Sequence, residues 1–310
     1  KFIRKCLDSL INNDYPKDNV EILIFDGGST DGTLEILKEY EMKYKFIKLF
    51  NNPKRFQVYA LNEGIRKAKG EIIIRCDAHS EYPKDYIKTL VEFHKKNLAD
   101  NIGGVWEVLP GGDTLVAKAI AIALNSKFGV GLSYRTMKKL KEPIYVDTVP
   151  FGSWKKQAFE KYGLFDERFI RAQDFEHNVR IRKMGGRILL IPWLQIKYYA
   201  RDSLYKLAKM SFQYGYAKIL VLKKHKFLGN KRQLMPPLFV LSLPISIFIY
   251  LPLYTLISFI LSVLNKDVKL TPFIFASFFV MHLFYGLGYL RGIYDVFIKE
   301  RIIEEWEITR

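Results

Sequence analysis

The 310-residue sequence predicts an α/β fold, a mostly parallel sheet flanked by helices, followed by a C-terminal hairpin of two transmembrane helices. The first observation is an alternation of short apolar strands and amphipathic helices, which is typical of parallel sheets with helices on both faces. The second is a pair of apolar runs, 236–264 and 271–290, each long enough to supply the roughly 20 residues that cross a bilayer. Together they predict an α/β domain at 1–200, a basic amphipathic segment at 201–232, a membrane hairpin at 236–298 and a tail at 299–310.

The strands and helices of the first domain follow one another in a regular order. The pattern predicts a strand at 20–26, a turn at 27–32, a helix marked by Leu34, Leu37 and Tyr40, a strand at 46–50, a helix at 57–69, a strand at 71–77 and a helix at 83–97. Asp26 and Asp77 each end a predicted strand. Because ligands of such sheets bind beyond the carboxyl ends of the strands, we expect the polar chemistry there.

The apolar runs differ from ordinary core helices in their lack of charge. Residues 236–264 carry no charged side chain, and residues 271–290 carry His282 as their ionisable group. A buried hairpin in a soluble core is the alternative, but soluble core helices seldom run so long without a charge. Pro244 and Pro252 are expected to kink the first helix or to make it partly re-entrant.

Positive charge is concentrated beside the predicted hairpin. The chain has 49 Lys and Arg against 32 Asp and Glu, a net charge of +17, and residues 197–232 hold ten Lys or Arg against Asp202, which is +9 of that total. The positive-inside rule places these flanks and the α/β domain in the cytoplasm of a multi-pass protein of the cell membrane. Apolar residues at helical spacing within this stretch predict a helix lying on anionic lipid, where each Lys contributes roughly 1 kcal/mol. A nucleic acid partner is therefore not expected.

Composition excludes other classes of protein. Hydrophobic residues make up 49% and aromatic residues 15% of the chain, which excludes a disordered protein. Cys6 and Cys76 are too few for a disulfide scaffold and lack the spacing of a zinc site. We expect them to be free, buried thiols of a fold that faces the cytosol.

Four motifs resemble one family. The run Phe25-Asp-Gly-Gly-Ser-Thr-Asp-Gly-Thr33 resembles the strand-end motif of glycosyltransferase family 2, inverting nucleotide-sugar enzymes of the GT-A fold. Asp77-Ala78-His79 stands where that family carries Asp-X-Asp, segment 149–167 resembles its acceptor side, and Gln173-Asp174-Phe175-Glu176 falls where it places the general base. The pattern is most similar to exopolysaccharide transferases of the succinoglycan type, which share the Phe128–Gly131 loop and a C-terminal membrane segment.

The resemblance implies a role for each residue. Asp26 and Asp77 would bind the donor, Asp77 and His79 would hold Mg²⁺ or Mn²⁺ on its diphosphate, and Asp174 would be the general base. The weaker acceptor-side residues are Glu176, Arg171 and Trp154. Each main assignment has a structural alternative: a turn carboxylate for Asp26, a packing side chain for His79, and a helix N-terminal carboxylate for Asp174.

Two departures from the family bear on function. The sequence opens inside a helix, so the family's first strand, which ends in Pro-X-Tyr/Phe-Asn, is expected to be missing, and activity would be doubtful without it. Gln213–Ala217 replaces the Gln-X-X-Arg-Trp of processive synthases, so extrusion of a polymer is not expected. The resulting hypothesis is a membrane-anchored inverting transferase that moves a sugar from a nucleotide-sugar to a lipid-linked or nascent polysaccharide. A polyprenyl-phosphate glycosyltransferase and a non-catalytic membrane scaffold are the alternatives.

Overall fold

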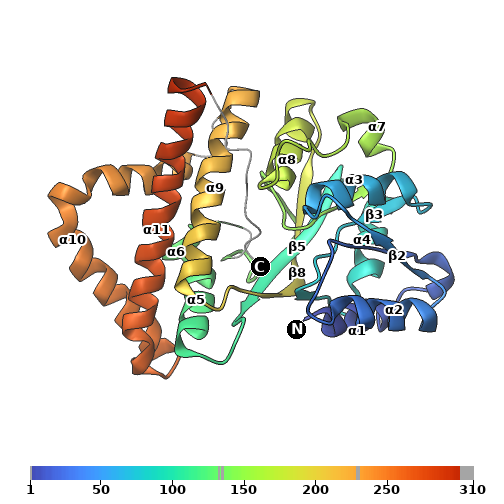
Figure 1. Ribbon diagram of the computed structural model, residues 1–310, viewed down its shortest axis with the longest axis horizontal. Coiled ribbons are helices and arrows are strands. Elements are labelled where there is room, and N and C mark those ends of the chain that lie inside the picture. Colours follow the sequence, from blue (N-terminus) through green and yellow to red (C-terminus); the bar gives the residue numbers. More distant parts are fainter. Residues whose placement is uncertain (1, 132, 134–135, 228–230, 301–310) are drawn as a thin grey trace. The chain divides into compact units, whose positions relative to one another are not determined.

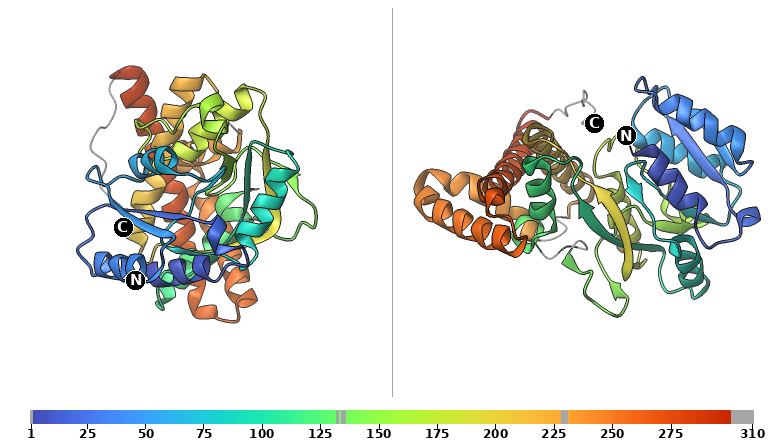
Figure 2. Two further views of the ribbon diagram at one scale, coloured as in Figure 1. Left: turned by 90° about the vertical axis from the view of Figure 1, so that its right-hand side faces the viewer. Right: turned by 90° about the horizontal axis from the view of Figure 1, so that it is seen from below.

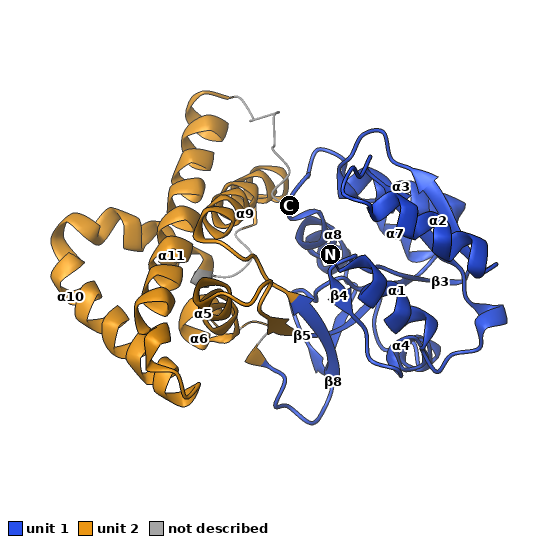
Figure 3. Ribbon diagram, turned by 60° about the horizontal axis from the view of Figure 1, so that its bottom comes forward, with its two compact units in different colours: residues 1–106, 137–198 blue, residues 107–136, 199–310 orange. Residues whose placement is uncertain are grey.

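The computed structural model describes residues 2–131, 133, 136–227 and 231–300. The chain forms two compact units (Figure 3), the first from residues 1–106 and 137–198 and the second from residues 107–136 and 199–310. Each unit is assembled from two separate stretches of the chain. This differs from the predicted single domain at 1–200, because residues 107–136 belong with the C-terminal helices.

The first unit begins with the predicted alternation. Strands β1 (Ile22–Asp26) and β2 (Ile47–Asn51) pair in parallel, and helices α1 (Ile3–Ile11), α2 (Thr33–Lys43) and α3 (Gln57–Lys67) surround them (Figure 2). Leu7 of α1, Leu37 of α2 and Ile47 form one cluster with Ile22 and Ile24 against it. On the other face, the Phe25 ring lies against Gly64 of α3. Side chains that alternate between the faces of β1 therefore explain why helices cover both.

The larger sheet is antiparallel in the pairings whose register is defined. Six strands take the order β3-β7-β5-β8-β4, with β6 also on β8, and β7 pairs antiparallel with β3 and β5, as β8 does with β4 and β6. Their bounds are β3 Ile72–Ile74, β4 Ser80–Glu81, β5 Asn101–Leu109, β6 Ile144–Tyr145, β7 Ser153–Lys155 and β8 Ile188–Tyr199. The mixed α/β class is confirmed, but the parallel part is smaller than predicted. The reason is that β3, predicted as a strand of the parallel sheet, pairs antiparallel with the later strand β7.

Three helices complete the first unit. They are α4 (Tyr86–Lys95), α7 (Ala158–Tyr162) and α8 (Gln173–Lys183). Helix α4 packs against β3 and β7, and α7 packs against β7 and α8. Between β5 and β8, the rings of Trp106 and Tyr198 stack at 4.0 Å between centroids. Helix α8 carries the predicted general base in its first turn.

The second unit is a bundle of apolar helices. It contains α5 (Leu115–Asn125), α6 (Lys127–Val130), α9 (Leu204–His225), α10 (Met235–Leu264) and α11 (Thr271–Ile293). Figure 1 shows α9 beside α11 and α10 bent, and Pro244 and Pro252 lie within α10. A proline removes a helix hydrogen bond and clashes with the preceding turn, which accounts for the bend. The predicted hairpin is confirmed as a pair of contacting helices, while its tail lies outside the described residues from position 301.

The basic helix α9 does not have a free apolar face. Its buried side chains include Leu207, Tyr216 and Ile219, and the backbones of α9 and α11 approach closely at Gly215 and Gly288. The face predicted to lie on lipid is therefore covered by protein, and contact of α9 with anionic lipid stays a prediction. Apolar residues at helical spacing predict a covered face, but they do not tell whether lipid or protein covers it. In α9 that face packs against α11.

Gly288→Ala is expected to loosen the second unit. A methyl group at Gly288 would stand 2.1 Å from the Phe212 carbonyl oxygen, a backbone atom that cannot rotate away. Overpacking of this kind typically costs about 1–3 kcal/mol, and small residues at helix crossings in membranes serve this close approach. Thermal unfolding of the whole chain in detergent measures the loss. Leu287→Ala, at the exposed neighbouring position, is the control, and equal melting temperatures for the two variants would contradict the packing role.

Helices α10 and α11 are long and apolar enough to span a membrane. The spans Met235–Leu264 and Val268–Ile298 have mean hydropathies of 2.2 and 1.7, and 17% and 39% of their most apolar windows are buried in the structure. Ile245 and Phe248 of α10 are 88% and 82% exposed. The core helix of a soluble protein would be mostly buried, so these faces favour association with a membrane. Residues of α5, α10 and α11 share one core cluster, which includes Ala119, Phe239, Tyr254, Ile274 and Phe278.

Candidate active site

Asp26 organises the turn that follows β1. Its carboxylate accepts hydrogen bonds from the backbone N–H groups of Gly28 and Ser29, at 2.9 and 3.0 Å, and from the Ser29 hydroxyl at 2.5 Å. Gly28 has a φ of +82°, a left-handed conformation that favours glycine. The alternative of a turn carboxylate is therefore what the structure contains. A donor contact by the same side chain stays a prediction.

Asp77 lies in a turn after β3 rather than on an extended strand. Strand β3 ends at Ile74, and the Asp77 carbonyl oxygen accepts the Ser80 N–H at 3.1 Å. The Asp77 N–H in turn donates to the Tyr82 hydroxyl at 2.7 Å. The strand predicted at 71–77 therefore ends at Ile74, and Asp77 and His79 lie in the turn that follows it. The His79 ring packs edge-on against Tyr198, with 4.9 Å between ring centroids.

Arg75 contacts both Asp77, a predicted donor-side residue, and Asp174, the predicted general base. Its Nε and one terminal nitrogen lie 3.2 and 3.4 Å from the two carboxylate oxygens of Asp77. The other terminal nitrogen lies 3.6 Å from Oδ2 of Asp174 in the first turn of α8. The structure thus brings Asp77 and Asp174 to one guanidinium, although they are far apart in the sequence.

Two glutamines complete this cluster. Gln57, the first residue of α3, donates from Nε2 to Asp77 at 2.6 Å and accepts from Arg75 at 3.1 Å. Gln173 donates to the same Gln57 oxygen at 3.0 Å. The sequence reading missed Arg75, Gln57 and Gln173. The signal for Arg75 was a charged residue directly after the apolar run Ile72–Ile74, but the glutamines carry no local signal.

Asp174 keeps access to solvent within this arrangement. Its side chain is 32% exposed, against 7% for Arg75. One carboxylate oxygen accepts the Phe175 N–H at 2.8 Å, and the other faces Arg75. A carboxylate at a helix start is stabilised by the macrodipole, so the structural and catalytic readings remain compatible.

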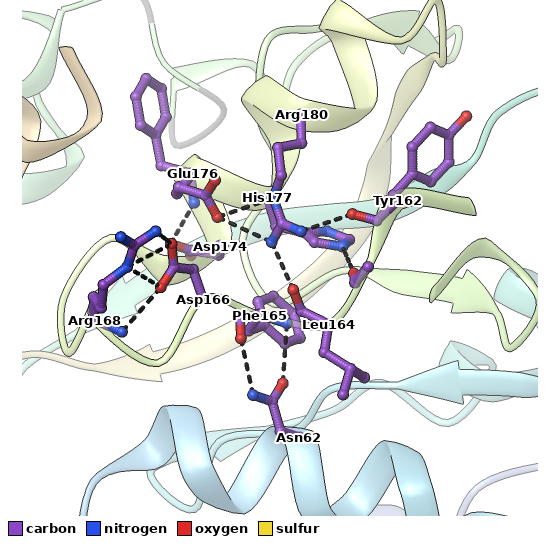
Figure 4. A network of polar contacts seen from close by, with 12 residues as sticks. Asn62, Tyr162, Leu164, Phe165, Asp166, Arg168, Asp174, Glu176, His177 and Arg180 are labelled. Carbon is purple, nitrogen blue, oxygen red and sulfur yellow. Dashed lines mark hydrogen bonds and ion pairs between the residues drawn. The ribbon is translucent and has the colours of Figure 1, made fainter. Parts of the chain in front are cut away.

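Glu176 has a structural role in α8. It is fully buried, and its Oε2 accepts both Nε and a terminal nitrogen of Arg180, at 3.1 and 3.0 Å (Figure 4). Arg180 also donates to the carbonyl oxygens of Tyr162 and Leu164, both at 2.7 Å. This pair therefore holds the loop before α8. An acceptor contact by Glu176 would require breaking a buried ion pair, so the structure does not support it.

The other two residues predicted on the acceptor side, Trp154 and Arg171, lie in different surroundings. Trp154 is 1% exposed and packs against Phe159, Phe165 and His177. The prediction that it contacts the acceptor is wrong, because β7 directs it into the core. Arg171 lies half-buried in the loop before α8, where an acceptor contact stays a prediction.

The cysteines stay protonated beside the candidate site. Both are free thiols, and Cys76 lies between Arg75 and Asp77 in the sequence. Desolvation raises the pKa of Cys76 to about 12 and raises the pKa of Cys6 well above its ordinary value. Neither thiol is a nucleophile at neutral pH as a result.

A divalent metal fits this site only with ligands from elsewhere. Among the described residues, no three His, Cys, Asp or Glu side chains are grouped to hold an ion. Oδ1 of Asp77 already accepts Gln57 and Arg75, while Oδ2 has the longer 3.4 Å contact with Arg75. Both oxygens of Asp77 are thus in contact with Gln57 or Arg75, and a metal ion would have to share or displace one of these contacts. This donor set fits an ion carried mainly by substrate phosphates and water, as Mg²⁺ commonly is in phosphate sites.

The fold of this chain, with sheets flanked by helices and acidic turns after two strands, is shared with solved structures. The mannosyltransferase PcManGT from Pyrobaculum calidifontis, solved with GDP-Man and Mn²⁺, superposes with a TM-score of 0.63 at 16% identity, covering 95% of this chain and 84% of that one. At this identity the likeness shows the fold alone. It confirms the predicted GT-A-like fold.

Sequence relatives give the family. The model of glycosyl transferase family 2 matches residues 1–163. The chain is 37% identical to the dolichyl N-acetyl-alpha-D-glucosaminyl phosphate 3-beta-D-2,3-diacetamido-2,3-dideoxy-beta-D-glucuronosyltransferase of Methanococcus voltae, over 73% of this chain and 72% of the relative. It is 32% identical to the succinoglycan biosynthesis protein ExoA of Rhizobium meliloti, over 70% and 66%. The chain belongs to glycosyl transferase family 2, which confirms the resemblance read from its motifs.

Proposed function

We propose that this protein is a membrane-anchored inverting glycosyltransferase that moves a sugar from a nucleotide-sugar donor to a lipid-linked or nascent polysaccharide acceptor. The observation that carries the proposal is the meeting of Asp77 and Asp174 on Arg75 in a chain of this family. In the proposed reaction Asp77 serves the donor and Asp174 serves the acceptor, as a single displacement requires. The name of the Methanococcus relative favours an acceptor linked to a lipid phosphate.

The proposed reaction is one in-line displacement. The acceptor hydroxyl gives its proton to the carboxylate of Asp174 as its oxygen bonds to the anomeric carbon. The bond between that carbon and the diphosphate oxygen breaks, and its electron pair leaves with the nucleoside diphosphate. Attack from the face opposite the leaving group inverts the anomeric centre. Asp174 fits the base role because it is the more exposed of the two carboxylates on Arg75.

The donor side is assigned to Asp26 and Asp77. Asp26 fixes the turn after β1, and Asp77 lies in the turn after β3, where its carboxylate is held by Gln57 and Arg75. A Mg²⁺ or Mn²⁺ ion bound with the donor would neutralise charge on the leaving diphosphate. His79 is the second proposed ligand and the weaker one, since its ring rests on Tyr198.

Labelled nucleotide sugars test this function directly. Membranes containing the protein are incubated with UDP- and GDP-sugars, with and without Mn²⁺, and the products are extracted and hydrolysed. Label in a polysaccharide, or in a lipid-linked glycan of two or more sugars, supports the proposal. Label in an organic-soluble lipid phosphate that carries a single sugar selects the polyprenyl-phosphate alternative, and no transfer above that of empty membranes selects the non-catalytic scaffold.

The C-terminal helices are proposed to span the cell membrane with the first unit in the cytoplasm. Lysines and arginines before α10 and Arg291 near the end of α11 fit the positive-inside rule. Lysines near the membrane surface would also attract anionic lipid. Two spans joined at residues 265–270 put both flanks on one side.

High salt is expected to leave the protein in the membrane. The exposed apolar surface of α10 would hold it there by burial, which salt does not weaken, whereas surface charge is screened within about 3 Å at 1 M salt. Membranes are washed with 1 M NaCl and separately with detergent, and the protein is followed by immunoblot in pellet and supernatant. Retention after salt and release by detergent is the expected result. Release by salt alone would show that charge rather than apolar burial attaches the chain.

A further inference from the structure

Arg75 occupies a position from which it reaches three structural elements. It follows β3, its backbone N–H donates to the Gly152 carbonyl at 3.1 Å, and its guanidinium lies 5.7 Å from the centre of the Phe151 ring. From there it contacts Asp77, Gln57 at the start of α3 and Asp174 at the start of α8. The side chain is almost fully buried, so its orientation is set by the protein and not by solvent.

The positive charge of Arg75 faces two carboxylates, those of Asp77 and Asp174. An arginine stays protonated and presents a rigid planar set of donors, which suits two carboxylates approached from different sides. The Asp77 contact involves two nitrogens, whereas the 3.6 Å approach to Asp174 is an ion pair too long for a hydrogen bond. Arg75 thus holds Asp77 by hydrogen bonds, whereas it attracts the Asp174 carboxylate by charge alone and forms no hydrogen bond with it.

We propose that Arg75 is a positioning residue that fixes the proposed base Asp174 relative to the donor-side carboxylate Asp77. The proposal rests on the proposed function. Without the guanidinium, two carboxylates would face each other with no cation between them, and Asp174 would turn away toward solvent. Arg75 therefore acts on turnover through Asp174 and on donor binding through Asp77.

Because Arg75 contacts both Asp174 and Asp77, its substitution is expected to change both kcat and the KM for the donor. Arg75→Met removes the charge and keeps an unbranched apolar chain beside Phe151. It should lower kcat about 10–100-fold, because a base displaced by about 1 Å loses up to roughly 10²-fold. It should also raise the donor KM several-fold through Asp77. Arg75→Lys, which keeps the charge but not the planar fork, should recover part of kcat.

A double-mutant cycle with Asp174→Asn tests the inference. The nucleotide sugar that supports wild-type turnover is used to measure kcat and donor KM for Arg75→Met, Asp174→Asn and the double variant in membranes. If Arg75 acts through Asp174, adding Arg75→Met to Asp174→Asn should lower kcat less than threefold further, while the rise in donor KM persists. Should Arg75→Met fail to accumulate as folded protein, the same cycle is run with Arg75→Lys.

Arg180→Met is the matched control, because Arg180 lies on α8, the helix that carries Asp174. Arg180 also pairs with a carboxylate of α8, but it anchors the loop at Tyr162 and Leu164 and makes no described contact with Asp174. Its effect on kcat should be the same with and without Asp174→Asn. If the full loss from Arg75→Met persists in the Asp174→Asn background, the inference is overturned while the function stands. If the wild type transfers no sugar, both the proposed function and this inference are rejected.

Discussion

Asp77→Asn is expected to reduce sugar transfer below detection, a loss of at least about 10²–10³-fold, the range seen when one charge-stabilising group is removed from an active site. The amide keeps the shape of the carboxylate but loses its charge, and one of its two terminal atoms becomes a donor. In the wild type, Gln57 and Arg75 both donate hydrogen bonds to Asp77. The amide N–H of the asparagine would face one of these donors and could not accept its hydrogen bond. Turnover with labelled nucleotide sugar and circular dichroism of the purified protein measure activity and folding.

The domain should survive this change. Leaving one polar atom of a largely buried group without a hydrogen-bond partner typically costs about 1–3 kcal/mol. Arg75 keeps its contacts with Gln57 and Asp174. His79→Ala is the companion variant, and it should lower the dependence on Mn²⁺ together with the rate. Turnover by Asp77→Asn close to that of the wild type would remove Asp77 from the donor site. Wild-type turnover unchanged in excess chelator would instead remove the metal.

Local periodicity predicted those elements whose neighbours in space are also neighbours in sequence. The β1–α2–β2–α3 region and the apolar hairpin follow from apolar spacing, from turn residues such as Gly28 and Gly32, and from length. The antiparallel pairs of β7 and β8 could not be predicted in this way. Register between strands such as β4 and β8, where Ser80 pairs with Tyr198, depends on which faces are buried together, and no short window of sequence encodes this.

The candidate site shows the same division. Asp77 and Asp174 were found because a carboxylate after a strand and a carboxylate at a helix start each have a local signal. Their meeting at Arg75 could not be found, since three segments around residues 57, 75 and 173 converge only in the folded sheet. Trp154 and Glu176 were misread for a related reason. Aromatic and acidic residues near a motif look alike in sequence whether they face a ligand or the core.

Asp174→Asn is expected to lower turnover by about 10²–10⁴-fold, the usual contribution of a general base. This corresponds to about 3–5 kcal/mol of activation free energy at roughly 1.4 kcal/mol per decade. The amide can still accept the Phe175 N–H, so the start of α8 keeps its geometry, but an amide oxygen does not take up the acceptor proton. Affinity for the nucleotide sugar, measured by calorimetry without acceptor, should change less than threefold, because the lost function concerns the acceptor.

Glu176→Gln is the matched control, two residues further along the same helix. Glu176 is buried against Arg180, so its substitution should lower the melting temperature while turnover per folded molecule falls less than tenfold. The reverse result, an inactive Glu176→Gln beside a nearly normal Asp174→Asn, would move the base by two residues. Equal loss of donor affinity in both variants would mean that the start of α8 supports the donor site, and the base would then have to come from another segment. Asp174 satisfies both requirements of a base on the acceptor side, because it shares Arg75 with the donor-side carboxylate and keeps 32% of its side chain open to an incoming hydroxyl.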